Sequence, residues 1–309
     1  MQEWDLSVLF IGNSLVQKVA HIMEMLISKS HCPSRVLLQV VAFEWFSLSD
    51  HARPLTGKNT RCVSRRECLR RAIACTACGI NATFRLQQRR WDLVVLQDQS
   101  QVPTFHAASG SRRILRRQFE ASKAAALYLA RLAPRGSVRF FAPWAFMDGL
   151  GRVNQSFITP TLGRVNHLEM QALIDEGYSR YRAAIRSAGG DAEVVRVSAA
   201  WKRVRDTSHS LYLSLYRLGD PHTLHSHPTP KGWYLAACVM YAALMGISPV
   251  GIAWAPKGVS RGERLALQRA AHAEARLQHP ANVYAPKCGP PSDRIPRLST
   301  ALYRGNWRS

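Results

Sequence analysis

A serine directly after a short apolar run is the first residue of this sequence whose position suggests chemistry. Ser14 stands in the tetrapeptide GNSL at 12–15, after the β-prone run at 8–11. Residues 17–28 then carry apolar side chains at helical spacing, which predicts a strand, a tight turn and a helix. Such a turn brings a side chain and free backbone N–H groups into one space, as a nucleophile requires. Ordinary turn chemistry or a helix N-cap is the alternative interpretation.

A polar loop late in the sequence contains the residue types that a serine nucleophile needs as partners. The loop spans 220–232, contains Asp220, His222, His225 and His227, and precedes an apolar stretch. A nucleophilic serine needs a base within hydrogen-bond reach and a carboxylate that fixes the tautomer of that base. The loop contains both, although histidines in a polar loop can also be solvated or cap the following helix.

Apolar runs alternate with helical patterns along the chain and predict the elements that position these residues. Strands are expected at 6–11, 35–41, 92–96, 138–142 and 193–197, and helices at 115–132, 168–187, 232–245 and 260–277. This alternation predicts an α/β fold with a parallel sheet covered on both faces. Ligands of such sheets bind beyond the carboxyl ends of the strands, so Ser14, the segment 97–100 and Trp144 should converge at one edge.

Composition limits the class of protein. The 309 residues, 47% of them hydrophobic, can bury a sizeable core, expected at 1–278, followed by a basic tail at 279–309 that contains Pro and Gly and is expected to be poorly ordered. The formal charge of +22 would suit an acidic partner such as nucleic acid. The arginine pairs are scattered, however, and no nucleic-acid motif accompanies them, which favours a solvated basic surface.

Other signals point to a protein that needs neither a membrane nor a cofactor. The uncharged stretch at 234–254 is broken by Gly-Ile-Ser-Pro at 246–249, which favours a buried core helix over a membrane span. Acidic Glu3 and Asp5 and the short first apolar run do not suit a signal peptide, so an intracellular location is expected. The seven cysteines are irregularly spaced, and the one C-x-x-C, at 75–78, has no second copy, so neither a disulfide framework nor a metal site is expected.

Three segments together resemble a known family. GNSL at 12–15, WDLVVLQDQS at 91–100 and HPTxxGxYLAA at 227–237 are similar, in this order, to the SGNH (GDSL-like) hydrolase superfamily, in particular the branch whose middle segment reads VVLQ, an acid and QS. The likeness covers about residues 5–277. It implies a three-layer α/β/α sandwich with a mostly parallel, five-stranded, flavodoxin-like sheet, and the hydrolysis of ester or acyl groups without a cofactor.

The resemblance also implies roles for catalytic residues. The family's nucleophile matches Ser14 and its base matches His227, with the two other histidines of the loop as alternatives. The orienting acid normally stands three residues before the base, where this sequence has Leu224. Asp220 is the nearest carboxylate and is therefore the expected third member of the triad.

The oxyanion hole departs from the family pattern. The family uses the N–H of the nucleophilic serine, a glycine N–H and an asparagine side chain, but here the glycine pair is replaced by Glu44-Trp45. A glutamine presents the same amide donor on a longer arm, so Gln97 or Gln99 can take the place of the asparagine beside the Ser14 N–H. Spacing does not choose between the two glutamines.

Four further residues carry expectations about the surroundings of the site. Asn13 and Trp144 are expected to line the substrate pocket. His51 and His106 are expected to be structural or exposed.

Three hypotheses about function follow. The first is a serine esterase that cleaves an O-acyl or O-acetyl bond of a small ester or an acylated glycan through an acyl-enzyme. The second is a catalytically impaired enzyme that binds a ligand in the same cleft, motivated by Leu224 and by Glu44-Trp45. The third is a basic protein associated with nucleic acid.

Overall fold

The computed structural model describes most of the region that carries the motifs. The described residues are 5–30, 36–44, 46–52, 82, 86–87, 89–108, 113–133, 137–147, 166–217 and 227–278. Asp220, His222, His225, Trp45, the C-x-x-C motif and the tail at 279–309 lie outside them. The predictions made for those residues therefore remain predictions.

Five parallel strands form the single sheet of the described residues, which confirms the predicted α/β class. They are β1 (Leu6–Gly12), β2 (Val36–Ala42), β3 (Leu93–Leu96), β4 (Ser137–Ala142) and β5 (Ala192–Arg196), in the order β2-β1-β3-β4-β5. This order is that of flavodoxin-like sheets. The central strands β1 and β3 are largely apolar because both of their faces are covered, and every residue of these two strands is buried.

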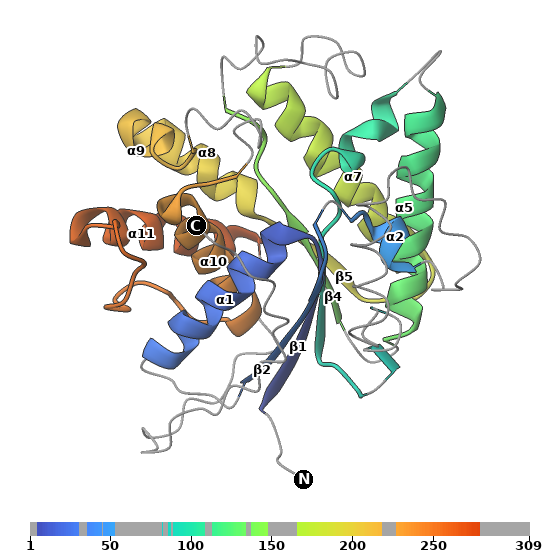
Figure 1. Ribbon diagram of the computed structural model, residues 1–309, viewed down its shortest axis with the longest axis horizontal. Coiled ribbons are helices and arrows are strands. Elements are labelled where there is room, and N and C mark those ends of the chain that lie inside the picture. The colour runs from blue at the N-terminus through green and yellow to red at the C-terminus, as the bar shows by residue number, and fades with distance from the viewer. Residues whose placement is uncertain are drawn as a thin grey trace, which may run out of the picture.

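Helices cover both faces of the sheet (Figure 1). One face carries α1 (Ser14–Lys29), α8 (Val197–Thr207), α10 (Pro230–Met245) and α11 (Arg261–Gln278), with the short α9 (His209–Leu213) beside α8. The other carries α2 (Leu48–Ala52), α5 (Arg113–Arg131), α7 (His167–Ser187) and the 3-10 helix η1 (Val102–Ala107). The molecule is therefore a three-layer α/β/α sandwich with one apolar core on each side of the sheet.

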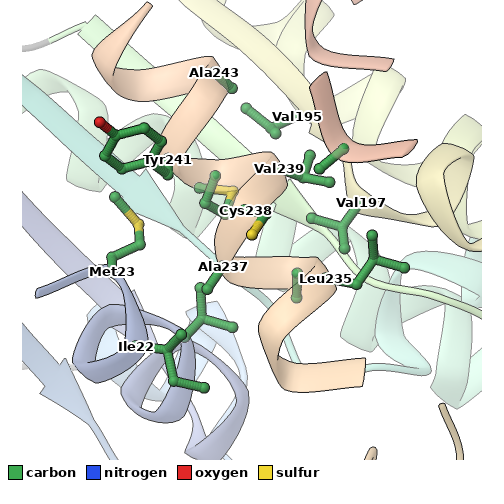
Figure 2. Close-up of a cluster of buried hydrophobic side chains, with 14 of the residues drawn as sticks. Ile22, Met23, Val195, Val197, Leu235, Ala237, Cys238, Val239, Tyr241 and Ala243 are labelled. Carbon is green, nitrogen blue, oxygen red and sulfur yellow. The ribbon is translucent and has the colours of Figure 1, made fainter. Parts of the chain in front are cut away.

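The helix α10 is the buried core helix that the sequence predicted. Its residues from Tyr234 to Met245 are all buried, and it packs against α1 and α11. Figure 2 shows its middle, with Cys238 and Val239, between Ile22 and Met23 of α1 on one side and Val195 of β5 and Val197 of α8 on the other. Among the described residues, no helix is both long enough and apolar enough to cross a membrane.

Short helices next to the strands were not predicted. The strand expected at 193–197 ends at Arg196, and α8 begins at the next residue without an intervening turn. The helices α2 and α9 have only five residues each, too few to show a helical period in the sequence. These helices, which the sequence did not predict, follow the carboxyl ends of β2 and β5, where the chain leaves the sheet.

Candidate active site at the carboxyl edge of the sheet

Ser14 lies at the first position of α1, immediately beyond the carboxyl end of β1. The register pairs Gly12 with Ala42 of β2, and the neighbouring Ile11 with Leu96 of β3, so the ends of three strands meet at this edge. The first N–H groups of a helix have no intrahelical acceptor and carry the positive end of the helix dipole. Ser14 is partly exposed there, and the first turn of α1 contains no acidic residue.

Asn13, not Ser14, caps this helix. The Asn13 side-chain oxygen accepts the N–H of Leu15 at 3.1 Å, and its own N–H donates to the Gln97 side-chain oxygen at 3.0 Å. The N-cap interpretation of the serine is therefore wrong, because the neighbouring residue performs that function. Among the described residues, the Ser14 hydroxyl forms no hydrogen bond, with His227 or with any other group.

Gly12 is required by close packing against β3. A Cβ atom at this position would lie 2.7 Å from the Gln97 side-chain oxygen and 2.9 Å from the Gln97 carbonyl oxygen. The glycine that precedes the serine motif thus lets the amide of Gln97 reach the turn. The turn and the end of β3 are consequently a single packed unit.

The two glutamines expected at the oxyanion hole have different surroundings. Gln97 is fully buried, its oxygen is bound to the Asn13 N–H, and its NH₂ group donates to the carbonyl of Asp98. Gln99 is only partly buried, and its side-chain oxygen accepts the N–H of Gln101 at 3.0 Å. The Gln97 amide is a structural bridge between β1 and β3, whereas the Gln99 side chain reaches the surface.

Asp98, two residues after the end of β3, has a fully buried carboxylate. One oxygen accepts the N–H groups of Leu48 at 3.0 Å and Gln99 at 2.8 Å, and the other accepts the Tyr181 hydroxyl at 2.8 Å. The Asp98 N–H donates to the hydroxyl of Tyr178 at 3.1 Å. Burial raises the pKa of Asp98 to about 6, opposed by the donated hydrogen bonds.

His51 of α2 is buried and bound to the same turn. Its Nε2 lies 2.8 Å from the Gly12 carbonyl oxygen, to which the neutral ring donates. Burial lowers the pKa of His51 to about 4, against the hydrogen bond to Gly12 and the charge of Asp50. His106 is likewise buried, with Nε2 3.1 Å from the carbonyl oxygen of Leu173. Both rings bind backbone, as expected for structural histidines.

His227 lies three residues before the start of α10, in a segment held against residues 214–217. Its carbonyl accepts the N–H of Arg217 at 3.3 Å, and Pro228 pairs with Tyr216. A Cβ atom at Gly232 would lie 2.6 Å from the carbonyl oxygen of Leu215, so the first turn of α10 fits only with glycine at that position. These contacts fix the backbone from which the His227 side chain extends.

A series of contacts between aromatic rings connects His227 to the sheet edge. The His227 ring lies 6.3 Å from that of Trp233, which meets Trp144 edge-on at 5.9 Å, and Trp144 stacks on Trp201 at 4.3 Å. Trp144 follows β4 by two residues, so His227 lies on the β4 side of the edge while Ser14 ends β1. Only β3 separates these two strands in the sheet, so their axes lie about 10 Å apart.

The structure thus brings Ser14, Asn13, Gln97, Gln99 and Trp144 to one edge of the sheet, as the sequence predicted. Trp144 is almost fully buried against Trp201. Asp220 lies outside the described residues, and so do the alternative bases His222 and His225.

The sequence assigned no role to Asp98 or Tyr181, and it did not indicate which backbone group the structural His51 binds. A polar residue directly after a buried strand was the available signal for Asp98. No local pattern connects it to Tyr178 and Tyr181, which are 80 and 83 positions later in the chain.

Comparisons with known proteins support the fold. No family model and no curated protein matches the sequence. A DUF4886 family protein from Bacteroides uniformis is 18% identical, with a TM-score of 0.63 over 90% of this chain and 96% of that one. An acetyl xylan esterase, AlAXEase, is 13% identical, with a TM-score of 0.46 over 77% and 100%. The acetylxylan esterase Axe2 from Geobacillus stearothermophilus is 11% identical, with a TM-score of 0.43 over 87% and 94%. The similarity to the Bacteroides protein shows that the fold is shared along nearly the whole of both chains.

Proposed function

We propose that this protein is a serine hydrolase of the SGNH type that cleaves an ester bond through an acyl-enzyme. The observation that carries the proposal is the position of Ser14 at the first turn of α1. Its hydroxyl is not used to cap the helix, because Asn13 is the cap. A hydroxyl at a helix N-terminus stands beside N–H groups that stabilise negative charge. The same position thus supplies a nucleophile and an oxyanion donor.

The proposed reaction has two similar halves. Ser14 Oγ attacks the ester carbonyl carbon while His227 takes the hydroxyl proton, and the resulting oxyanion is stabilised by the Ser14 N–H. The intermediate collapses, the alcohol leaves with the proton from His227, and acyl-Ser14 remains. Water then attacks the acyl group in the same way and regenerates Ser14. Asp220 would orient the imidazole of His227.

Gln99 is the better of the two glutamines for the amide donor of the oxyanion hole. The Gln97 side chain is fully buried, and both ends of its amide are engaged within the protein. The Gln99 side chain is partly exposed and uses its oxygen toward Gln101, so its NH₂ group can face a ligand. We assign the substrate to small esters, among them acylated glycans.

The proposal is tested with a fluorophosphonate probe, which reacts covalently with activated serines. We expect the wild-type protein to be labelled and Ser14→Ala not to be. His227→Ala should be labelled at least about 100-fold more slowly, because the general base is lost. Ser28→Ala, at the opposite end of α1, is the matched control and should be labelled as wild type is.

Two outcomes would contradict the proposal. Labelling that persists in Ser14→Ala would place the nucleophile elsewhere. A folded wild-type protein that does not react, and that hydrolyses none of a panel of p-nitrophenyl esters and acetylated glycans, would favour the alternative of an impaired enzyme that binds a ligand in the same place. If the wild-type protein is labelled at Ser14, separate substitutions Asp220→Asn, His222→Ala and His225→Ala decide which other residues of the loop contribute to the labelling rate.

A further inference from the structure

We infer that Asp98 is a positioning residue for the proposed hydrolysis: it holds α2 at the carboxyl edge of the sheet, and α2 holds the turn that carries Ser14. The expected effect of Asp98 on the rate of hydrolysis rests on the proposed function, whereas its role in holding α2 does not. The connection runs from the Asp98 carboxylate to the Leu48 N–H, and from His51 on the same short helix to the Gly12 carbonyl. We call these two connections the Asp98–His51 brace.

The Asp98 end of the brace uses acceptors alone. Both oxygens are occupied, one by two backbone N–H groups and the other by the Tyr181 hydroxyl. A carboxylate suits this arrangement because it offers two acceptor oxygens and no donor. An asparagine whose oxygen faces the N–H groups offers them a neutral and therefore weaker acceptor than the carboxylate, and it presents its NH₂ group to Tyr181, whose hydroxyl must then accept instead of donate. An amide therefore fits in size but weakens the hydrogen bonds of the brace.

The His51 end of the brace has a fixed donor. The ring is buried against Phe43 and Phe46, whose ring centroids lie 5.9 Å and 5.2 Å from its own. Because its pKa is lowered to about 4, His51 is neutral near pH 7, with its proton on the Nε2 that faces Gly12. The first turn of α2 is itself tied by Asp50, whose carboxylate accepts the Ser47 N–H at 3.0 Å.

The brace and Gln97 hold the nucleophile turn from two sides. The Gly12 carbonyl is bound by His51, while the N–H of Asn13, on the other side of the same peptide group, is bound by Gln97. Because a peptide group is planar, holding it from both sides fixes its orientation, and the N–H of Ser14 belongs to the next peptide group along the chain. Oxyanion donors act only when they are aimed at the developing charge before the reaction, so a small reorientation lowers the rate more than it lowers substrate binding.

The test compares two aspartates at the ends of the same strand. Asp98→Asn weakens the brace, and Asp92→Asn changes the carboxylate at the opposite end of β3, where it accepts the N–H and hydroxyl of Ser7. With p-nitrophenyl acetate, we expect kcat to fall at least about 10-fold in Asp98→Asn while KM stays within about threefold. The rate of fluorophosphonate labelling at Ser14 should fall in parallel. Asp92→Asn should keep both rates within about twofold of wild type.

Amide hydrogen exchange tests the brace without reference to catalysis. The Leu48 and Gln99 amides should exchange faster in Asp98→Asn than in wild type, and at the wild-type rate in Asp92→Asn. If Asp98→Asn does not fold, Tyr181→Phe removes one donor to the carboxylate and should show the same changes at smaller size.

The outcomes separate the two proposals. A wild-type protein that is not labelled contradicts the proposed function, and the brace is then judged by amide exchange alone. A wild-type protein labelled at Ser14, together with an unchanged kcat in Asp98→Asn, overturns the positioning role. Equal exchange of the Leu48 amide in Asp98→Asn and wild type overturns the brace itself.

Discussion

The two ends of β3 use the same type of residue in different surroundings. At the amino end, Asp92 is exposed and binds the N–H and hydroxyl of Ser7, which joins β3 to β1. At the carboxyl end, Asp98 is fully buried and binds α2, its own loop and α7. An exposed carboxylate that loses its partner is rehydrated, whereas the partners of a buried one are left without water. The carboxyl end, where Ser14 lies, is therefore the more tightly constrained of the two.

The largest expected difference between these ends is in stability. Asp98→Ala takes the acceptor from the buried Leu48 N–H, the buried Tyr181 hydroxyl and the partly buried Gln99 N–H, which should lower the free energy of unfolding by about 4 kcal/mol. Asp92→Ala should lower it by about 1 kcal/mol, because Ser7 is buried but Asp92 is exposed, and removal of the Asp92 side chain lets water reach the Ser7 groups. Urea denaturation measures both. Equal losses would show that the two ends are constrained alike.

A second prediction concerns the two buried titratable groups at the carboxyl end. Folding raises the pKa of Asp98 to about 6, so the folded protein binds this proton more tightly than the unfolded chain does. Stability from Asp98 is thus highest at low pH and decreases as the pH rises from about 4 to 6. Folding lowers the pKa of His51 to about 4, so stability from His51 increases as the pH rises from about 4 to 6.5.

These opposite slopes should nearly cancel in the wild-type protein and appear when one group is removed. Relative to wild type, Asp98→Asn should gain about 3 kcal/mol of unfolding free energy between pH 4 and pH 6, and His51→Gln should lose about as much between pH 4 and pH 6.5. Urea titrations at several pH values measure the differences. Parallel curves for the two variants would contradict the assignment of buried, oppositely shifted groups.

The strands and the site edge were predictable because their signals are local. A continuous apolar run such as that of β1 marks a strand covered on both faces, and the glycine and polar residues after it mark the turn. The position of Ser14 at the carboxyl edge follows from those runs and from the rule for parallel sheets. The exact start of α1 could not be predicted from those runs, because the helix cap depends on the contact between Asn13 and Gln97.

The contacts that hold the edge together were not predictable because their partners are remote in sequence. Asp98 meets Tyr181 from α7 and Leu48 from a helix of only five residues. Gln97 was expected to be an oxyanion donor from its amide alone, and its burial against Asn13 depends on the strand register. Residue type indicates what chemistry a side chain can do, whereas packing decides whether it faces the protein or a ligand.

The smallest of these predictions compares a crowded glycine at the carboxyl edge with an open one on α11. Gly12→Ala forces a Cβ atom against Gln97 and should lower the free energy of unfolding by about 2 kcal/mol. Gly262→Ala meets no neighbour within 4 Å and should raise it by about 0.5 kcal/mol, through the better helix propensity of alanine. Urea denaturation separates the two signs, and fluorophosphonate labelling should slow only in Gly12→Ala, because Gly12 carries the carbonyl that His51 binds. A Gly12→Ala protein with wild-type stability would show that Gln97 can move away from the turn, and hence that the carboxyl edge is less constrained than its hydrogen bonds imply.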